Sequence, residues 1–172
     1  RDNVCFDGAP AVQTAAGGLP STVYEQAALL RAAQIAGGLE KILAMTVQYA
    51  GERHQFGRPI AKFQAVQHNL AALAGHTAAA YAALEAAADA PDFIAIAAAK
   101  ACASEAAGEA AAIAHQVHGA IGFTEEHDLH RYTKALWAWR EEFGNEAYWN
   151  SRLGGQMAAR GGNGMWPDIV GS

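Results

Sequence analysis

Apolar residues recur at helical spacing through most of this chain. The first run starts at about Val23 and ends near Arg53, with an apolar side chain at every third or fourth position. Its members are Leu29, Leu30, Ala33, Ala36, Leu39, Ile42, Leu43 and Val47. The pattern predicts one long helix of roughly 30 residues, because this spacing places the apolar side chains on a single face.

Two further long helices are predicted after this one. The second begins at Pro59, because proline is favoured in the first turn of a helix, and continues to about Ala88. A turn follows, in which Pro91 is placed to open the next helix. The third helix then runs from Phe93 to about Val117.

Two shorter helices are predicted near the end of the chain. Thr124 is expected to cap the fourth, with Glu125 and Glu126 in its first turn, where acidic side chains favour the positive end of the helix dipole. The last helix spans roughly Asn145 to Arg160. Short connections between long helices favour antiparallel neighbours.

The ends of the chain differ from this helical body. Val4 and Phe6 alternate with polar neighbours, so residues 1–22 are interpreted as the end of a β-domain and a linker. The fold class predicted is all-α: an up-down four-helix bundle with an extra C-terminal helix over residues 23–160, preceded by a remnant β-strand of a β-rich domain that the sequence does not include. We expect the tail, residues 161–172, to be mobile.

Composition narrows the possible functions. The 172 residues are 52% hydrophobic and 17% charged, which suits one packed domain. A net charge of −5 without a basic run argues against nucleic acid as a partner. Every long apolar stretch is interrupted by a charged residue or His, so no membrane span is predicted. Cys5 and Cys102 lie far apart, which favours a cytoplasmic protein without a disulfide framework, and Cys102 is expected in the core.

Common catalytic signatures are missing from the sequence. No Glu is followed three positions later by His, the pair with which helical bundles hold di-iron sites. His127 and His130 lie one turn apart, but no third zinc ligand accompanies them. We therefore predict no metal site. Nucleophile-elbow, Walker and dinucleotide glycine motifs are also missing.

One polar segment, "GERHQFGRPIAKFQAVQH" (Gly51–His68), interrupts the first two helices. The Arg53 guanidinium can hold a pyrophosphate at two points. Phe56 can pack on a flat ring, and the amides of Gln55 and Gln64 can donate hydrogen bonds. The same residues also suit a plain helix–turn–helix corner, in which Arg53 lies at a helix end that favours a cation.

A second segment, "QVHGAIGF", runs from Gln116 to Phe123. Gly119 and Gly122 interrupt a helical run, and the helix start that follows offers free backbone N–H groups, which suits an anion or a nucleotide. A glycine C-cap followed by a turn is the alternative.

Taken together, the two segments resemble the signatures of the acyl-CoA dehydrogenase family. "YAGERHQFGRPIAKFQAVQHNLA" is similar to the pattern of an Arg, a Phe-Gly, a Pro-Ile and a Phe-Gln before Gln-His-x-Leu-Ala, and "HQVHGAIGFTEEHDLHRY" to Gln-x-x-Gly-Gly-x-Gly-Phe followed by an acid. The order of the signatures and their separation also fit. The resemblance extends from Val23 to about Leu153, and "DNVCFDGAPA" resembles the last strand of the family's middle β-domain.

The resemblance implies a function. Family members bind FAD, oxidise an acyl-CoA thioester to the 2,3-enoyl-CoA, and pass electrons to an electron-transfer flavoprotein. Their C-terminal bundles assemble homo-oligomers, dimers or tetramers, in which one subunit contacts the FAD of its neighbour. Carried over by position, the FAD contacts would be Arg53, Gln55, Phe56, Gln64 and the run Gln116, Val117, His118, Gly119 and Ala120, where Ala120 replaces the second glycine of the family pair.

The catalytic base is the point at which this chain departs from the family. Many members carry it in a Glu-Gly-Thr motif, at which an ungapped count places Phe143, Gly144 and Asn145. Glu142, one position earlier, is the candidate base. Other members carry the base on the first bundle helix, near Ala27 and Ala28 here, where Glu25 is the closest acid, roughly half a turn away.

Two functions therefore stay open. The first is a FAD-dependent acyl-CoA dehydrogenase, represented by its C-terminal domain. The alternative is a non-catalytic FAD-binding or structural subunit of a heteromeric acyl-CoA dehydrogenase. A helical scaffold without flavin would have no need of Arg53, Gln64, Gln116 and Gly119 together.

Overall fold

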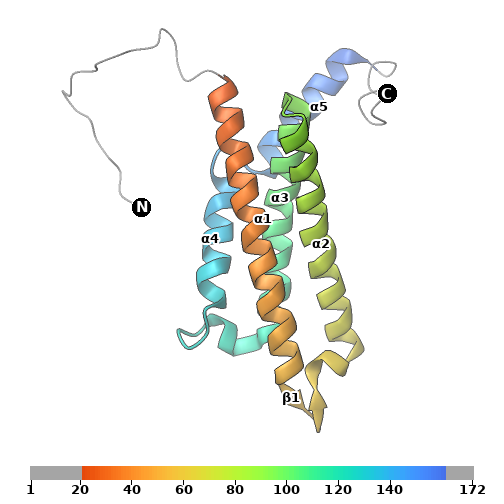
Figure 1. The fold of residues 1–172 in the computed structure, drawn as a ribbon, viewed down its shortest axis with the longest axis vertical. Coiled ribbons are helices and arrows are strands. Elements are labelled where there is room, and N and C mark those ends of the chain that lie inside the picture. The colour runs from red at the N-terminus through yellow and green to blue at the C-terminus, as the bar shows by residue number, and fades with distance from the viewer. Residues whose placement is uncertain (1–20, 162–172) are drawn as a thin grey trace, which may run out of the picture.

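Residues 21–161 are described by a computed structural model, and they form a bundle of long helices (Figure 1). The bundle helices are α1 (Ser21–Glu52), α2 (Gln64–Asp89), α3 (Phe93–His118) and α4 (Leu129–Glu141). A fifth helix, α5 (Glu146–Arg160), packs against α3 at one end of the bundle. The all-α, four-helix-bundle prediction is confirmed. The predicted N-terminal strand and residues 162–172 of the predicted tail lie outside the described residues.

Helix α3 occupies the centre of the bundle, where it contacts α1, α2, α4 and α5. Nine of its 14 buried residues are alanine, and most of the large apolar side chains that fill the space come from the helices around it. The largest fully buried aliphatic side chains are Ile35, Leu39, Ile42, Leu73, Leu129 and Leu136. Small residues on α3 let four helices approach one axis closely, which explains the strong alanine bias of its sequence.

The segment between α1 and α2 differs from the prediction. Helix α2 begins at Gln64 and not at Pro59. Pro59 pairs with His54 in a two-strand hairpin of β1 (His54–Gln55) and β2 (Arg58–Pro59), which was not predicted. Proline suits this place because a short edge strand needs no N–H from it. A 3₁₀ turn, η1 (Ile60–Lys62), then leads into α2.

The start of α4 was also predicted wrongly. The segment after α3 forms a 3₁₀ turn, η2 (Gly119–Phe123), and α4 begins only at Leu129. Thr124 closes η2, since its hydroxyl donates to the Ile121 carbonyl at 2.9 Å, and it caps no helix. Glu125 and Glu126 therefore lie in a loop before α4 and not in its first turn.

The remaining helix boundaries are close to those predicted. Asp92 caps α3, where its Oδ1 accepts from the Ala95 N–H at 2.8 Å. Asn145 caps α5 in the same way, accepting from the Tyr148 N–H at 3.1 Å. Cys102 is only half-buried, and burial together with Glu105 raises the pKa of its thiol.

Two negative findings concern the described residues alone. None of their helices has the length and apolarity needed to cross a bilayer. Nor do residues 21–161 contain a group of three or more His, Cys, Asp or Glu side chains arranged to hold a metal ion.

Candidate functional site

The two polar segments singled out in the sequence meet at one end of the bundle. The hairpin lies where α1 gives way to α2, and η2 lies beside it at the end of α3 (Figure 1). Between them is a cavity of about 330 Å³, which we name the polar corner. Its lining residues are Tyr49, Arg53, Gln55, Ile60, Gln116, Val117, His118, Gly119 and Ala120. Seven of these are among the nine residues predicted to contact FAD.

Backbone hydrogen bonds hold Arg53 at the polar corner. Its N–H donates to the Tyr49 carbonyl at 2.8 Å, which continues α1, and its own carbonyl accepts from the Ile60 N–H at 2.8 Å. The second bond closes the base of the hairpin, so the chain reverses beside Arg53. The side chain is exposed, and no carboxylate among residues 21–161 pairs with it.

Phe56 and Gln64 lie outside the lining of the polar corner. Phe56 and Gly57 form the hairpin tip with φ of 51° and 77°, the left-handed values that a tight two-residue hairpin requires. Phe56 is 92% exposed, and its ring meets that of Phe63 edge to face, with ring centroids 6.2 Å apart. Gln64 is exposed in the first turn of α2.

Glycines shape the other side of the polar corner. Gly119 ends α3 with φ of 65°. Apart from its chain neighbours, no atom of residues 21–161 lies within 4 Å of where its Cβ would be, so the backbone is open to a ligand there. Gly122 has the opposite role. A Cβ on it would lie 3.0 Å from His118 Cβ and 3.1 Å from Leu129 Cδ2, so Gly122 lets η2 pack tightly on the bundle. Ala120, in place of the family's second glycine, is exposed at the rim.

Tyr49 belongs to the polar corner but was not predicted from the sequence. Its ring stacks on His118 with centroids 4.4 Å apart, and its hydroxyl donates to the His118 carbonyl at 3.3 Å. The contact joins the end of α1 to the end of α3. The sequence did contain a signal for Tyr49: it precedes Arg53 by four positions and therefore lies on the same face of α1.

His118 is buried and faces the same cavity. Its Nδ1 lies 2.8 Å from the Ala114 carbonyl, while its Nε2 is buried without a partner in the described part of the chain. Burial is the main cause that lowers the pKa of His118, and the neighbouring His127 and His115 lower it further. The hydrogen bond to the Ala114 carbonyl raises it in part. The imidazole is therefore neutral at pH 7, with Nδ1 protonated and Nε2 able to accept a hydrogen bond.

The chemistry of the polar corner fits an anionic, polar ligand. It offers the Arg53 cation, two glutamine amides and open backbone at Gly119, while no carboxylate lines it. Guanidinium and amide donors of this kind suit phosphate oxygens. The residues present therefore fit the diphosphate and ribose part of a dinucleotide.

A second, larger cavity of about 560 Å³ opens on α1, which we name the α1 cavity. It is lined by Ala27, Leu30, Arg31, Ala33, Gln34 and Phe143. The family resemblance would put a catalytic base at one of two places, and the cavity lining includes a residue from each: Ala27, from the place near Ala27 and Ala28, and Phe143. The fold brings them to one cavity, and neither is an acid.

Glu142, the candidate base, is held by an ion pair. Its Oε2 contacts the Nη2 of Arg31, and the two side chains are only 10% and 18% exposed. Arg31 also donates to Gln34 and lies over Trp139 and Phe143, at 5.8 and 6.0 Å from the ring centroids. Glu142 therefore lies beside the α1 cavity with its carboxylate turned to Arg31 and is not among the residues that line it.

Known proteins resemble this chain over its helical part. A match to the family described as acyl-CoA dehydrogenase, C-terminal domain, covers residues 21–149. Acyl-CoA dehydrogenase IpdE2 of Mycobacterium tuberculosis is 46% identical over 112 residues, which are 65% of this chain and 35% of that protein. The chain thus spans about a third of the length of that relative.

Solved structures agree with the sequence match. The ChsE4–ChsE5 complex of Mycobacterium tuberculosis has a chain that is 32% identical, with a TM-score of 0.74 over 83% of this chain and 40% of that one. Butyryl-CoA dehydrogenase of Megasphaera elsdenii is 27% identical, with a TM-score of 0.75 over 80% of this chain and 37% of that one. Since the family match covers most of the chain, this protein belongs to the acyl-CoA dehydrogenase family, whose C-terminal helical domain it contains.

Proposed function

We propose that this chain is the C-terminal domain of a FAD-dependent acyl-CoA dehydrogenase and that the polar corner binds the diphosphate–adenosine part of FAD. The observation that carries the proposal is the convergence of two distant segments on one cavity, beside an exposed cation that no carboxylate of residues 21–161 pairs with. Arg53 and Gln55 come from the first segment, Gln116 and Gly119 from the second. A pair of unrelated turns has no need to place these groups together.

Each group has a role in this proposal. Arg53 neutralises the diphosphate, and Gln55 and Gln116 donate to its oxygens or to the ribose. Open backbone at Gly119 allows the nucleotide to approach closely. Buried His118 lines the corner and supports the Tyr49 ring that stacks on it. Phe56, exposed at the hairpin tip, is placed to meet a second subunit or its nucleotide and not the polar corner of its own chain.

The reaction would be the α,β-dehydrogenation of an acyl-CoA thioester. A bound flavin supplies the acceptor for the hydride that leaves the β-carbon, and an electron-transfer flavoprotein is the proposed onward acceptor. The chain itself would contribute the apolar wall of the α1 cavity, with Leu30, Ala33 and Phe143 excluding water from the acyl group. A base must lie within hydrogen-bond reach of the α-proton.

One observation favours the second candidate, a non-catalytic subunit of a heteromeric acyl-CoA dehydrogenase. The α1 cavity has Ala27 and Phe143 at the two places for a base, and the candidate base Glu142 is paired with Arg31. The ChsE4–ChsE5 relative is itself a complex of two different chains. In such an assembly this chain would bind FAD at a subunit interface, and its partner would carry the base.

The test uses the full-length protein. Its visible spectrum is recorded, and a panel of acyl-CoA thioesters is then added without oxygen. Bleaching of the flavin band would establish the dehydrogenase, and Glu142→Gln would then test the base, with loss of bleaching expected only if Glu142 leaves Arg31 during the reaction. A bound flavin that no thioester bleaches would favour the non-catalytic subunit, and a colourless protein would refute the FAD assignment.

A further inference from the structure

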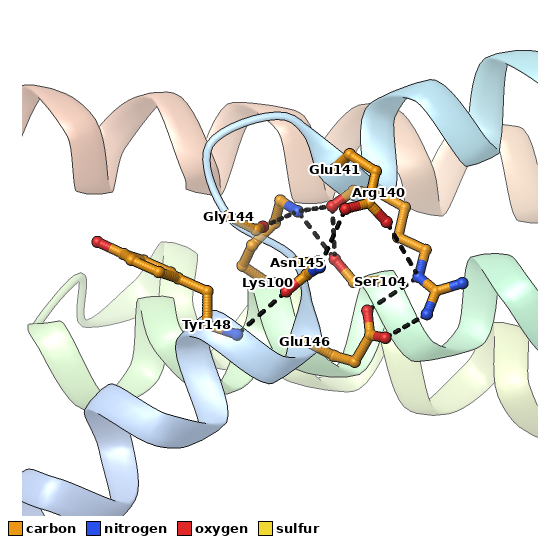
Figure 2. A network of polar contacts seen from close by, with 8 residues as sticks. All are labelled: Lys100, Ser104, Arg140, Glu141, Gly144, Asn145, Glu146 and Tyr148. Atoms are coloured by element: carbon orange, nitrogen blue, oxygen red, sulfur yellow. Dashed lines mark hydrogen bonds and ion pairs between the residues drawn. The ribbon is translucent and has the colours of Figure 1, made fainter.

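Lys100 is a fully buried lysine in the alanine-rich centre of α3. It is 0% exposed, and its ammonium makes three hydrogen bonds (Figure 2). The acceptors are Ser104 Oγ at 2.8 Å, the Arg140 carbonyl at 2.9 Å and the Gly144 carbonyl at 2.6 Å. Three acceptors match the three protons of the charged form. A buried lysine is costly, so this arrangement needs a reason beyond packing.

Two of these acceptors bracket the connection between α4 and α5. The Arg140 carbonyl belongs to the last turn of α4, where a cation satisfies an orphan acceptor and favours the negative end of the helix dipole. The Gly144 carbonyl lies in the segment 142–145, which we name the α4–α5 turn. Lys100 therefore ties both ends of this turn to the central helix of the bundle.

The α4–α5 turn has a backbone that must be held in place. Phe143 has φ of 55°, which is uncommon for a bulky residue, and Gly144 follows with φ of 86°. The Phe143 carbonyl accepts a hydrogen bond from Trp149 Nε1 at 2.9 Å, and the Gly144 carbonyl accepts one from Lys100 Nζ. These bonds hold the segment in which Phe143 points to the α1 cavity and Glu142 to Arg31.

A second clamp closes the turn from outside. The Arg140 guanidinium donates to both carboxylate oxygens of Glu146, so the residues on either side of the turn are joined directly (Figure 2). The hydrogen bond from Arg140 lowers the pKa of the Glu146 carboxyl. This outer clamp fixes the spacing of α4 and α5 but contacts neither Phe143 nor the Gly144 carbonyl. From α3, Lys100 holds the Arg140 and Gly144 carbonyls at 2.9 and 2.6 Å, while Ser104 adds only a longer bond of 3.4 Å to the Arg140 carbonyl.

We propose that Lys100 is a positioning residue: by holding the Arg140 and Gly144 carbonyls, it fixes the α4–α5 turn and thereby sets the wall that Phe143 presents to the α1 cavity. The part of this inference that concerns a thioester in the cavity rests on the proposed function. The part that concerns the turn does not. Lys100 is not among the residues that line the α1 cavity, so its effect reaches the cavity through the backbone of the turn.

The test compares Lys100→Met with Lys41→Met in the full-length protein. Methionine keeps the length of the side chain and removes every donor, while Lys41 is an exposed lysine on α1 that serves as the control. Hydrogen exchange is followed in peptides covering residues 141–149, where the Tyr148 and Trp149 amides are both bonded to Asn145. Losing charged hydrogen bonds should speed exchange there by about tenfold or more. Peptides over residues 116–123 and the flavin content should not change.

Two results would overturn the inference about the turn. One is exchange over residues 141–149 that stays at the wild-type rate. The other is an equal increase throughout α1 and α3, which would make Lys100 a general stabiliser of the bundle. If Lys100→Met gives no folded protein, Lys100→Gln, which keeps two donors on a shorter side chain, is measured in its place with the same criteria.

The role at the cavity has its own measurement. The probe is whichever thioester of the panel most perturbs the wild-type flavin band, and its Kd should rise about tenfold in Lys100→Met while FAD is retained. A faster-exchanging turn with an unchanged Kd would overturn the positioning role. If no thioester perturbs the wild-type flavin, the proposed function has failed, and the exchange data still decide whether Lys100 holds the turn.

Discussion

Burial of Lys100 predicts an unusual pH dependence of stability. Burial, first of all, lowers the pKa of Lys100 from 10.5 to about 8. Charged neighbours change this pKa by smaller amounts. Glu141 raises it most, followed by Glu146; Arg31 then lowers it, and Glu142 raises it least. Between pH 8 and 10.5 the unfolded chain therefore holds a proton on Lys100 that the folded chain has released.

The sign follows from this difference in bound protons. Because the unfolded state binds more protons in this window, the free energy of unfolding rises with pH. At pH 7 the lysine is charged in both states and its full burial penalty is present. Raising the pH to 9.5 should relieve about 2 kcal/mol of that penalty, from a pKa difference of about 2.5 units.

The assay is urea denaturation of the wild type and of Lys100→Met at pH 7 and pH 9.5. The pKa of the half-buried Cys102 thiol is raised in the folded state, so this group lowers the free energy of unfolding as the pH rises over the same range. Both proteins carry Cys102, and its effect therefore cancels in the difference between them. The wild type should therefore gain about 2 kcal/mol relative to the variant. If the free energy of unfolding changes with pH equally in the two proteins, the conclusion that Lys100 is buried as a charged group is refuted.

Three other predictions test single contacts. Gly122→Ala should lower stability by about 1–3 kcal/mol, seen as a lower Tm, because its Cβ would lie within 3.2 Å of three side-chain atoms; an unchanged Tm would mean that η2 packs loosely. In a double-mutant cycle, Arg31→Met and Glu142→Gln should show a coupling of about 1–3 kcal/mol by denaturation, since both side chains are largely buried, and additive effects would contradict the ion pair. Trp149→Phe should cost about 1–3 kcal/mol, because it leaves the Phe143 carbonyl without its donor, and a loss confined to ring volume would be smaller.

The helical bundle could be predicted because its signal is periodic. Apolar spacing over long segments gave α1 and α3 to within a few residues. Asp92 and Asn145 were not predicted as caps, although each lies within one residue of a predicted helix start. The hairpin could not be found in the same way. Two-residue strands have no period, and the tip is Phe56-Gly57 in place of the usual Asn-Gly, so one bulky residue takes a left-handed conformation. Pro59 suits a helix start and an edge strand equally well.

The polar corner could be predicted in large part because its residues lie in two short, unusual segments. Arg53, Gln55 and the run from Gln116 to Ala120 do meet there, although their contacts to FAD stay a prediction. Thr124 was assigned to the wrong element because a cap and a 3₁₀ closure look alike in sequence. Lys100 gave no signal at all: an isolated lysine in a helix is normally exposed, and two of its acceptors lie 40 and 44 positions further along the chain.

The central claim is that the polar corner holds a dinucleotide through Arg53. The most direct measurement is the flavin-to-protein ratio of the full-length protein, compared with Arg53→Gln and Arg58→Gln. Arg58 is the matched control, because it is an exposed arginine of the same hairpin that lies over Phe63 and does not line the corner. Loss of a bidentate charged contact should weaken FAD binding about tenfold or more, so Arg53→Gln should be purified largely without flavin while Arg58→Gln keeps it. Equal flavin content in all three proteins would contradict the account.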